Sequence, residues 1–422
     1  MLIFPKYFVE RPSQTRLKHG ILREYAGAWT GIISTGLQNQ ARKKPTARDI
    51  QFSFVYVDGF AGAGAYQRDA HQNVATGPIW GSPVIGTRQI VERLRGVPLT
   101  TSVSAIFCEA SPEHHDALLH NLQEAPLGIP YRSIRRVAEA QRGEASVLQA
   151  DFRSCSGEIA RWLGNSYGLV LVDPWGSGMK MRDLAPLVGR KKVDTIILYP
   201  ATDVKRFGSC ASKSRAKLTP NDRSNLTRLN DLFGDERWQA IFADEYLVRP
   251  EDRESEALAL YVQILTEVDP SLIVKTIRLR NSAVDRTSYY LVLTTRNESG
   301  ALRMNSVLRT AEFREHFAVW ADYEERERKK AEQHGVLSLG LEDEFVAPPA
   351  PPPTEFPASD VGDAIALRCG AGALTLRDIW RRLADDPYTE DEIRKGLRNL
   401  KERNQASFDR LRALGDTITL RV

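Results

Sequence analysis

Five short apolar runs alternate with segments of helical periodicity, and this pattern constrains the fold more than any other feature of the chain. The runs, rich in Val, Ile and Leu, lie at 52–60, 104–110, 145–151, 167–176 and 194–201. Apolar runs of this length, with helical sequence between them, are typical of buried parallel strands. Two more runs, at 271–281 and 288–295, predict an antiparallel hairpin. The chain is therefore expected to form a doubly wound α/β sheet that ends in a hairpin.

Composition divides the remainder of the chain. Apolar residues at helical spacing over 16–35 predict a helix within an N-terminal helical lead, and the sheet domain is expected to follow it. Six prolines between 342 and 358 predict a stiff, extended linker. The predicted divisions are a lead at 1–50, a sheet domain at 51–310, a charged helix at 311–341, the linker at 342–358 and a last domain at 359–422.

Bulk composition excludes several classes of protein. The 422 residues are 42% hydrophobic and 27% charged, which is the mix of a folded globular protein and not of a fibrous or disordered one. No apolar run approaches the ~18 residues of a membrane span, and the first residues lack a signal-peptide core, so a cytoplasmic protein is expected. The four cysteines form no CxxC pair and the histidines no HxxxH pair, so no metal site is expected.

Glycines and acids stand at the ends of the first three predicted strands. The first strand runs into a Gly-rich turn at 58–64, where missing side chains let a ligand approach the backbone. An acid after the second strand can accept hydrogen bonds from ribose hydroxyls, and one after the third can meet an adenine amino group. The candidate cofactor-binding residues are Asp58, Phe60, Ala61, Gly62, Gly64, Glu109 and Asp151.

This order of glycine turn and acidic strand ends resembles the class I S-adenosylmethionine-dependent methyltransferases. A nicotinamide-binding Rossmann domain would show GxGxxG opening a helix directly. Here a polar insertion at 66–80 separates the turn from Gly81-Ser82-Pro83, which begins the next predicted helix. The resemblance implies a Rossmann-like methyltransferase sheet with S-adenosylmethionine as cofactor. Considered by itself, the Gly-rich turn at 58–64 could instead be a tight strand-to-helix connection that binds no ligand.

A more specific set of residues resembles the three-Cys-motif partner protein (TcmP) family. It comprises Lys18 and Tyr25 in the opening helix, YVDGFAGAG at 56–64, GSP at 81–83, FCEA at 107–110 and LVDPWG at 171–176. The resemblance covers roughly residues 15–300. It implies a methyltransferase-like fold and a co-encoded partner that carries three motif cysteines and resembles radical-SAM enzymes.

The end of the fourth strand supplies candidate catalytic residues. Asp173, Pro174 and Trp175 resemble the Asp/Asn-Pro-Pro-aromatic tip of exocyclic amino methyltransferases, with the aromatic residue one place early. There the acid accepts a hydrogen bond from the target amine, and the ring stacks on an extruded base. A strand-end cap for Asp173 and a packing role for Trp175 are the alternatives. Cytosine C5 methylation is disfavoured because the sequence has no Pro-Cys dipeptide.

Two basic segments are candidate nucleic-acid contacts. A predicted loop after the fifth strand carries Lys205, Arg206, Lys213, Arg215 and Lys217, and should overhang the acceptor side of the site. The last domain reads as three helices and a hairpin, which resembles a winged helix. Its third helix, the element that such folds place in a major groove, carries Arg394, Lys395, Arg398 and Lys401. Simple solvation of the loop and protein docking by the last domain are the alternatives.

Two functions follow from these expectations. The first is an S-adenosylmethionine-dependent methyltransferase that acts on a nucleic-acid base, in DNA or RNA, together with the three-Cys-motif protein. The second is a non-catalytic module that uses a methyltransferase fold to recruit or regulate that partner.

Overall fold

The computed structural model describes residues 2–43, 50–69, 78–174, 179–243, 249–281, 286–311 and 355–421, and the single positions 313 and 328. Trp175 lies outside the described residues, as do residues 342–354 of the predicted linker and all but two positions of the charged helix predicted beyond 311.

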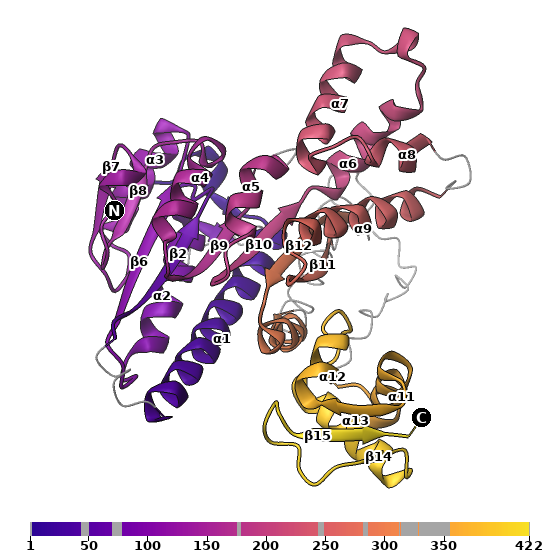
Figure 1. The fold of residues 1–422 in the computed structure, drawn as a ribbon. Coiled ribbons are helices and arrows are strands. Elements are labelled where there is room, and N and C mark those ends of the chain that lie inside the picture. The colour runs from indigo at the N-terminus through magenta and orange to yellow at the C-terminus, as the bar shows by residue number, and fades with distance from the viewer. Residues whose placement is uncertain are drawn as a thin grey trace, which may run out of the picture.

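An eight-stranded sheet crosses the centre of the larger part of the molecule (Figure 1). In spatial order its strands are β11 (Ile273–Asn281), β12 (Arg286–Thr295), β10 (Val193–Tyr199), β9 (Tyr167–Val172), β2 (Phe52–Asp58), β6 (Thr101–Cys108), β8 (Ala145–Leu148) and β7 (Tyr131–Ile134). Of these eight strands, β12 alone runs in the opposite direction to the rest. The predicted parallel strands and hairpin are confirmed, and β7 is an addition that the sequence pattern did not predict.

Helices cover both faces of this sheet, which makes it a Rossmann-like α/β architecture. Alternate residues of β2 face opposite ways: Val55 and Val57 join the core beneath α4 and α5, while Phe54 and Tyr56 join the core beneath α1 and α2. The helices of this part include α1 (Ser13–Lys43), α2 (Ser82–Leu94), α3 (Pro112–Leu122), η3 (Val137–Glu139), α4 (Phe152–Leu163), α5 (Met181–Val188), α8 (Trp238–Ala243), α9 (Pro250–Val268) and a helix over 298–311. The helix predicted at 16–35 is therefore part of a longer one that belongs to the sheet's core.

Residues 2–12, here called the N-terminal strap, cross the surface before α1 begins. The strap contains η1 (Lys6–Phe8) and β1 (Glu10–Arg11), and β1 pairs in parallel with β4 (Arg68–Asp69). The Asn121 side chain brackets the backbone N–H and C=O of Ile3, each at 2.8 Å. Beside the strap, β3 (Ala65–Tyr66) pairs with β5 (Ile79–Trp80). The strap is thus fastened to segments that follow the glycine turn.

The segment after β10 corrects a prediction. Residues 205–217 were expected to form a loop, but α6 (Ala201–Gly208) begins immediately after the strand and the 3-10 helices η4 (Ser209–Ser212) and η5 (Arg215–Lys217) follow. Val204 and Phe207 are buried one helical turn apart, which fixes the buried side of α6. A capping box at Thr219 then opens α7 (Pro220–Phe233).

The last domain has its own apolar core. It comprises α11 (Ala358–Cys369), β13 (Gly372–Thr375), α12 (Leu376–Arg382), α13 (Glu390–Glu402), β14 (Ala406–Ser407) and β15 (Thr417–Leu420), with the strands in the order β13-β15-β14. A capping box between Thr389 and Glu392 opens α13. Leu302, from the helix over 298–311, is fully buried in the same core, so the domain packs directly on the sheet domain.

Polar contacts strengthen that packing. The buried Lys275 ammonium of β11 donates to the backbone oxygens of Ala384 (3.1 Å) and Asp386 (2.9 Å). Arg309 forms a two-pronged ion pair with Glu392, whose side chain is 3% exposed.

None of the helices described is long and apolar enough to cross a membrane.

Candidate functional site

A cavity of about 260 Å³ opens at the carboxyl ends of β2, β6 and β8. This is the edge at which doubly wound sheets bind their ligands. Four predicted cofactor residues line it together: Phe60, Gly62, Glu109 and Asp151. The rest of its wall comes from Phe8, Gly59, Cys108, Ala110, Ser111, His114, Ala150, Phe152 and Arg153. Residues more than 140 positions apart in the sequence therefore meet at one site.

The glycine turn has a conformation that side chains would oppose. Gly62 and Gly64 have φ of +59° and +74°, in the left-handed region. A Cβ at Gly64 would lie 2.5 Å from Leu118 Cδ1, and one at Gly62 would lie 2.6 Å from Phe8 Cζ. The space beside Gly62 is thus taken by the ring of Phe8.

Glu109 ties the turn to the end of β6. Its Oε2 accepts from the backbone N–H of Gly62 at 2.9 Å, and its Oε1 accepts from that of Ser111 at 2.8 Å. His114 Nδ1 lies 3.8 Å from Oε1. Because each carboxylate oxygen can accept more than one hydrogen bond, Glu109 can still receive a ligand hydroxyl at the cavity wall.

Asp151 also lines the cavity, as the N-cap of α4. It accepts from the backbone N–H of Arg153 at 3.0 Å, and the Arg153 guanidinium lies 3.0 and 3.1 Å from its two oxygens. Its side chain is 43% exposed. An exposed carboxylate in this position can accept from an amino group that enters the cavity.

Asp58 lies behind the cavity and not in its wall. The side chain is fully buried, accepts from Phe60 N and Tyr56 Oη, both at 3.2 Å, and also hydrogen-bonds Ser82. Burial raises the pKa of Asp58 from its ordinary 3.8 to about 7. Ala61 and Gly64 are likewise buried behind the surface of the turn. These three residues shape the turn from within.

Asp173 and Pro174 lie at the end of β9, beside a separate small cavity. The Lys18 ammonium donates to Asp173 Oδ2 at 2.5 Å. The cavity, about 10 Å³, is lined by Lys18, His19, Ser82 and Asp173 together with apolar residues of α1, β9, β10 and β12. Tyr25, the other residue of the opening helix that the resemblance rests on, donates to the buried Asp194 at 3.0 Å. The predicted catalytic acid is therefore ion-paired to α1.

The basic residues predicted between 205 and 217 separate into two groups. Lys213 pairs with the buried Asp222 at 2.9 Å, and Arg206 pairs with Asp203 at 2.8 Å. Lys205 and Lys217 are exposed, and Arg215 lies in η5. α7 adds Arg223 and Arg228, both exposed. The guanidinium groups of Arg206 and Arg228 lie 4.4 and 5.9 Å from the centre of the Phe207 ring. The predicted basic loop is thus part of a basic helical surface over α6 and α7.

Most cations predicted on α13 have intramolecular partners. Arg394 donates to the Leu411 carbonyl and lies over the Trp380 ring; Lys395 pairs with Glu355; and Lys401 donates to the Phe408 carbonyl. Among the described residues, Arg398 is exposed without an ion-pair partner. The charge that α13 offers to a partner is smaller than its sequence indicates.

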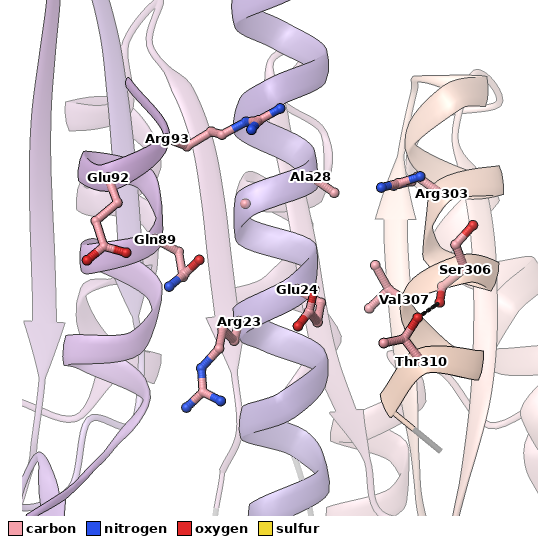
Figure 2. A pocket seen from close by; sticks show the side chains of 11 residues that line it. Arg23, Glu24, Ala28, Gln89, Glu92, Arg93, Arg303, Ser306, Val307 and Thr310 are labelled. Atoms are coloured by element: carbon pink, nitrogen blue, oxygen red, sulfur yellow. Dashed lines mark hydrogen bonds between the residues drawn. The ribbon is translucent and has the colours of Figure 1, made fainter. Parts of the chain in front are cut away.

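A wider groove of about 380 Å³ lies on the side of the molecule between α1, α2 and the helix over 298–311. Figure 2 shows its charged lining, which includes Arg23, Arg93 and Arg303 with Glu24 and Glu92. It is away from the strand ends, and none of the predicted site residues lines it.

Sequence reasoning missed Phe8, His114 and Arg153 in the cavity wall. A single aromatic residue in the irregular strap gives no periodic signal. For His114 the signal that could have been used is Ser111 followed by Pro112, a pair typical of a helix N-terminus, which starts α3 just after β6. The four cysteines are buried and free, as packing residues would be, and the described residues hold no cluster of three or more His, Cys, Asp or Glu for a metal.

The chain has few similarities to known proteins. No family model matches the chain, and no curated protein matches it. Among solved structures it is similar to protein LPL1258 from Legionella pneumophila str. Philadelphia 1, described under the family model DUF519. The two are 10% identical, with a TM-score of 0.32, over 66% of this chain and 85% of that one. A likeness at that score does not define a shared fold.

Proposed function

We propose that the chain is an S-adenosylmethionine-dependent methyltransferase that acts on a base in DNA or RNA. One observation carries the proposal: the glycine turn, Glu109 and Asp151 all line the cavity at the carboxyl ends of β2, β6 and β8. Two carboxylates in the lining of a partly apolar cavity suit a nucleoside, whose ribose hydroxyls and adenine amino group are hydrogen-bond donors.

The sheet order supports a methyltransferase over a nicotinamide-binding enzyme. The order β8-β6-β2-β9-β10 is the 3-2-1-4-5 arrangement of doubly wound sheets. Next to β10, however, stands the antiparallel β12 and not a sixth parallel strand. A sheet that ends in such a hairpin resembles the class I methyltransferases, and so does the sequence from the Gly-rich turn to the fourth strand end.

Different residues would hold the cofactor and the methyl acceptor. Bound S-adenosylmethionine supplies a methyl group on a positively charged sulfur. Glu109 and Asp151 hold the nucleoside part, and the Gly62 backbone fixes the turn beside it. Asp173 orients the acceptor amine by accepting its hydrogen bond, and Lys18 keeps the carboxylate in place through their 2.5 Å ion pair. Positioning by such contacts accounts for much of the rate that an enzyme achieves.

The basic surface of α6 and α7 supports a nucleic acid as the acceptor. Between residues 203 and 228 the chain has seven Lys and Arg against two Asp. Exposed cations of this density attract a phosphate backbone. The last domain, three helices with a three-stranded sheet, resembles a winged helix and adds Arg398 as a further contact. A three-Cys-motif, radical-SAM-like protein is the proposed partner, on the basis of the TcmP resemblance.

Two measurements on one set of proteins test the function. Wild-type protein should take up S-adenosylmethionine in a calorimetric titration and transfer labelled methyl to DNA or RNA. Asp173→Asn should bind the cofactor as the wild type does but lose transfer by on the order of 10²-fold or more. Asp116→Asn, a change at an 81% exposed acid of α3, is the control and should leave both unchanged.

The alternative function is a non-catalytic module that recruits or regulates the three-Cys-motif protein. The Lys18–Asp173 ion pair favours it, because it engages the proposed catalytic acid within the protein. Cofactor uptake without transfer to any nucleic acid, with and without the partner present, would establish this alternative. Absence of cofactor uptake would reject the proposed cofactor itself.

A further inference from the structure

The proposed cofactor pocket and the proposed catalytic acid occupy two separate cavities. The 260 Å³ pocket and the 10 Å³ cavity beside Asp173 have no lining residue in common. A methyl group carried by a ligand in the first must reach an acceptor held at the second. The pocket is also below the roughly 300–1,000 Å³ of typical ligand sites. In this conformation it suits a nucleoside better than a longer molecule.

Four aromatic rings in mutual contact lead from one cavity to the other. His114, in the wall of the pocket, lies 5.0 Å from Phe8 between ring centroids. Phe8 lies 5.2 Å from Tyr66, and Tyr66 lies 5.8 Å from His19. His19 lines the Asp173 cavity, and its buried Nδ1 has no hydrogen-bond partner among the described residues. This aromatic row is the partition between the two cavities.

Phe8 is the member of the row that the N-terminal strap supplies. His114 belongs to α3, His19 to α1 and Tyr66 to β3, whereas Phe8 belongs to the strap. The strap is held by a two-residue strand pair, by the Asn121 bracket at Ile3, and by the packing of Phe8 on Ala63 and Ala117. Two ion pairs, Arg11–Asp69 and Glu10–Arg68, add to these contacts. These contacts can break without disturbing the sheet, because none of them involves a strand of it.

We infer that Phe8 is a gate that determines the length of ligand the pocket accepts. With the ring against Gly62, the pocket admits a nucleoside. With the ring displaced, the pocket extends past the turn toward Asp173, and a ligand with an amino-acid extension fits. The inference rests on the proposed function, and names the residue by which the pocket distinguishes S-adenosylmethionine from adenosine.

Calorimetric titrations with adenosine and with S-adenosylmethionine test the gate. Phe8→Ala should bind S-adenosylmethionine at least about tenfold more tightly than the wild type, with the ring displaced in a tenth of wild-type molecules or fewer. It should bind adenosine within about twofold of the wild type, because the closed pocket already admits that ligand. Tyr7→Ala removes a neighbouring, 61% exposed ring of the strap and should change neither affinity.

Hydrogen exchange on the wild type gives a second test that needs no variant. S-adenosylmethionine should speed exchange at the backbone amides of Gln67 and Arg68, which donate to strap carbonyls at 3.1 Å each, whereas adenosine should not. Slower exchange with S-adenosylmethionine, or a weaker affinity of Phe8→Ala for it, would make the ring a permanent wall and overturn the gate. If adenosine binds and Phe8→Ala leaves the S-adenosylmethionine affinity unchanged, the gate alone is wrong. If neither ligand binds either protein, the proposed cofactor is wrong and the gate falls with it.

Discussion

Gly62 has a left-handed backbone, and the Phe8 ring fills the space where its side chain would begin. From the sequence, a glycine at this position is needed to leave room for a ligand. The structure adds a second requirement, because any side chain would push the strap away from the turn. A bulky residue at 62 therefore disturbs the turn, the strap and the pocket together, whereas a change at Phe8 acts on the pocket without straining the turn.

The raised pKa of Asp58 should make the folded protein less stable as the pH rises. Because burial raises the pKa of Asp58 to about 7, the folded protein binds a proton there that the unfolded chain releases above about pH 4. Stability is lost progressively between these values, by up to about 4 kcal/mol. Asp58→Asn, which stays neutral, should therefore gain stability relative to the wild type as the pH rises from 4 to 8.

Urea unfolding of both proteins at several pH values measures this difference. Burial lowers the pKa of His19, so His19 makes stability rise with pH. This contribution is the same in the variant and the wild type, and it cancels when their free energies of unfolding are subtracted. A constant difference between variant and wild type from pH 4 to 8 would show that Asp58 has an ordinary pKa in the folded protein.

At the scale of elements, the strands were predictable and the surroundings of the site were not. The runs that became β2, β6, β8, β9 and β10 are apolar because both faces of each strand are covered. β7 was not predicted because only one of its four residues is buried, so its sequence lacks the apolar run of a buried strand. α6 was not predicted because Val204 and Phe207, its two large buried side chains, are too few to give a helical pattern beside the Ser- and Lys-rich sequence that follows.

The basic surface of α6 and α7 predicts a salt-dependent affinity for nucleic acid. Lys217→Gln with Arg223→Gln removes two exposed cations, which should weaken binding and lower the slope of log affinity against log salt by about 1.5. Fluorescence anisotropy with a labelled oligonucleotide at several salt concentrations measures the slope. Arg95→Gln with Lys191→Gln removes two exposed cations from the opposite edge of the sheet and should leave it unchanged. Equal losses in the two double variants would contradict a specific surface on α6 and α7.

For the whole molecule, the predicted linker invites the expectation of a freely tethered last domain, and the contacts of that domain indicate otherwise. Leu302 contributes to the core of the last domain from the other side of the segment that joins them. Lys275, Asn305 and Arg309 all bind the stretch between α12 and α13. Sequence patterns could not reveal this, because Leu302 looks like any buried residue of an amphipathic helix and nothing marks which core it enters.

Proteolysis within 342–354 should therefore leave the two pieces together. On size exclusion at physiological salt the cut protein should elute as one particle. Glu392→Ala leaves the guanidinium of Arg309 without its carboxylate and should weaken the association by about 3–5 kcal/mol, enough to release the last domain. Asp391→Ala, one residue away and 87% exposed, should release nothing. Separation of the two pieces in the wild type would show that these contacts are too weak to hold the domain.

The place of β12 in the sheet bears on how the protein is made. β10 is buried at every residue, and its partner on one side is β12. Thr195 of β10 hydrogen-bonds Thr294 of β12, 99 residues later in the chain. At ~5–20 residues per second, the ribosome needs on the order of 5–20 s to synthesise that stretch. During this time the edge of an apolar strand is unpaired, and such edges pair readily with other chains. Slow synthesis of residues 200–295 should therefore increase aggregation in the cell, although the finished protein leaves no edge of β10 exposed.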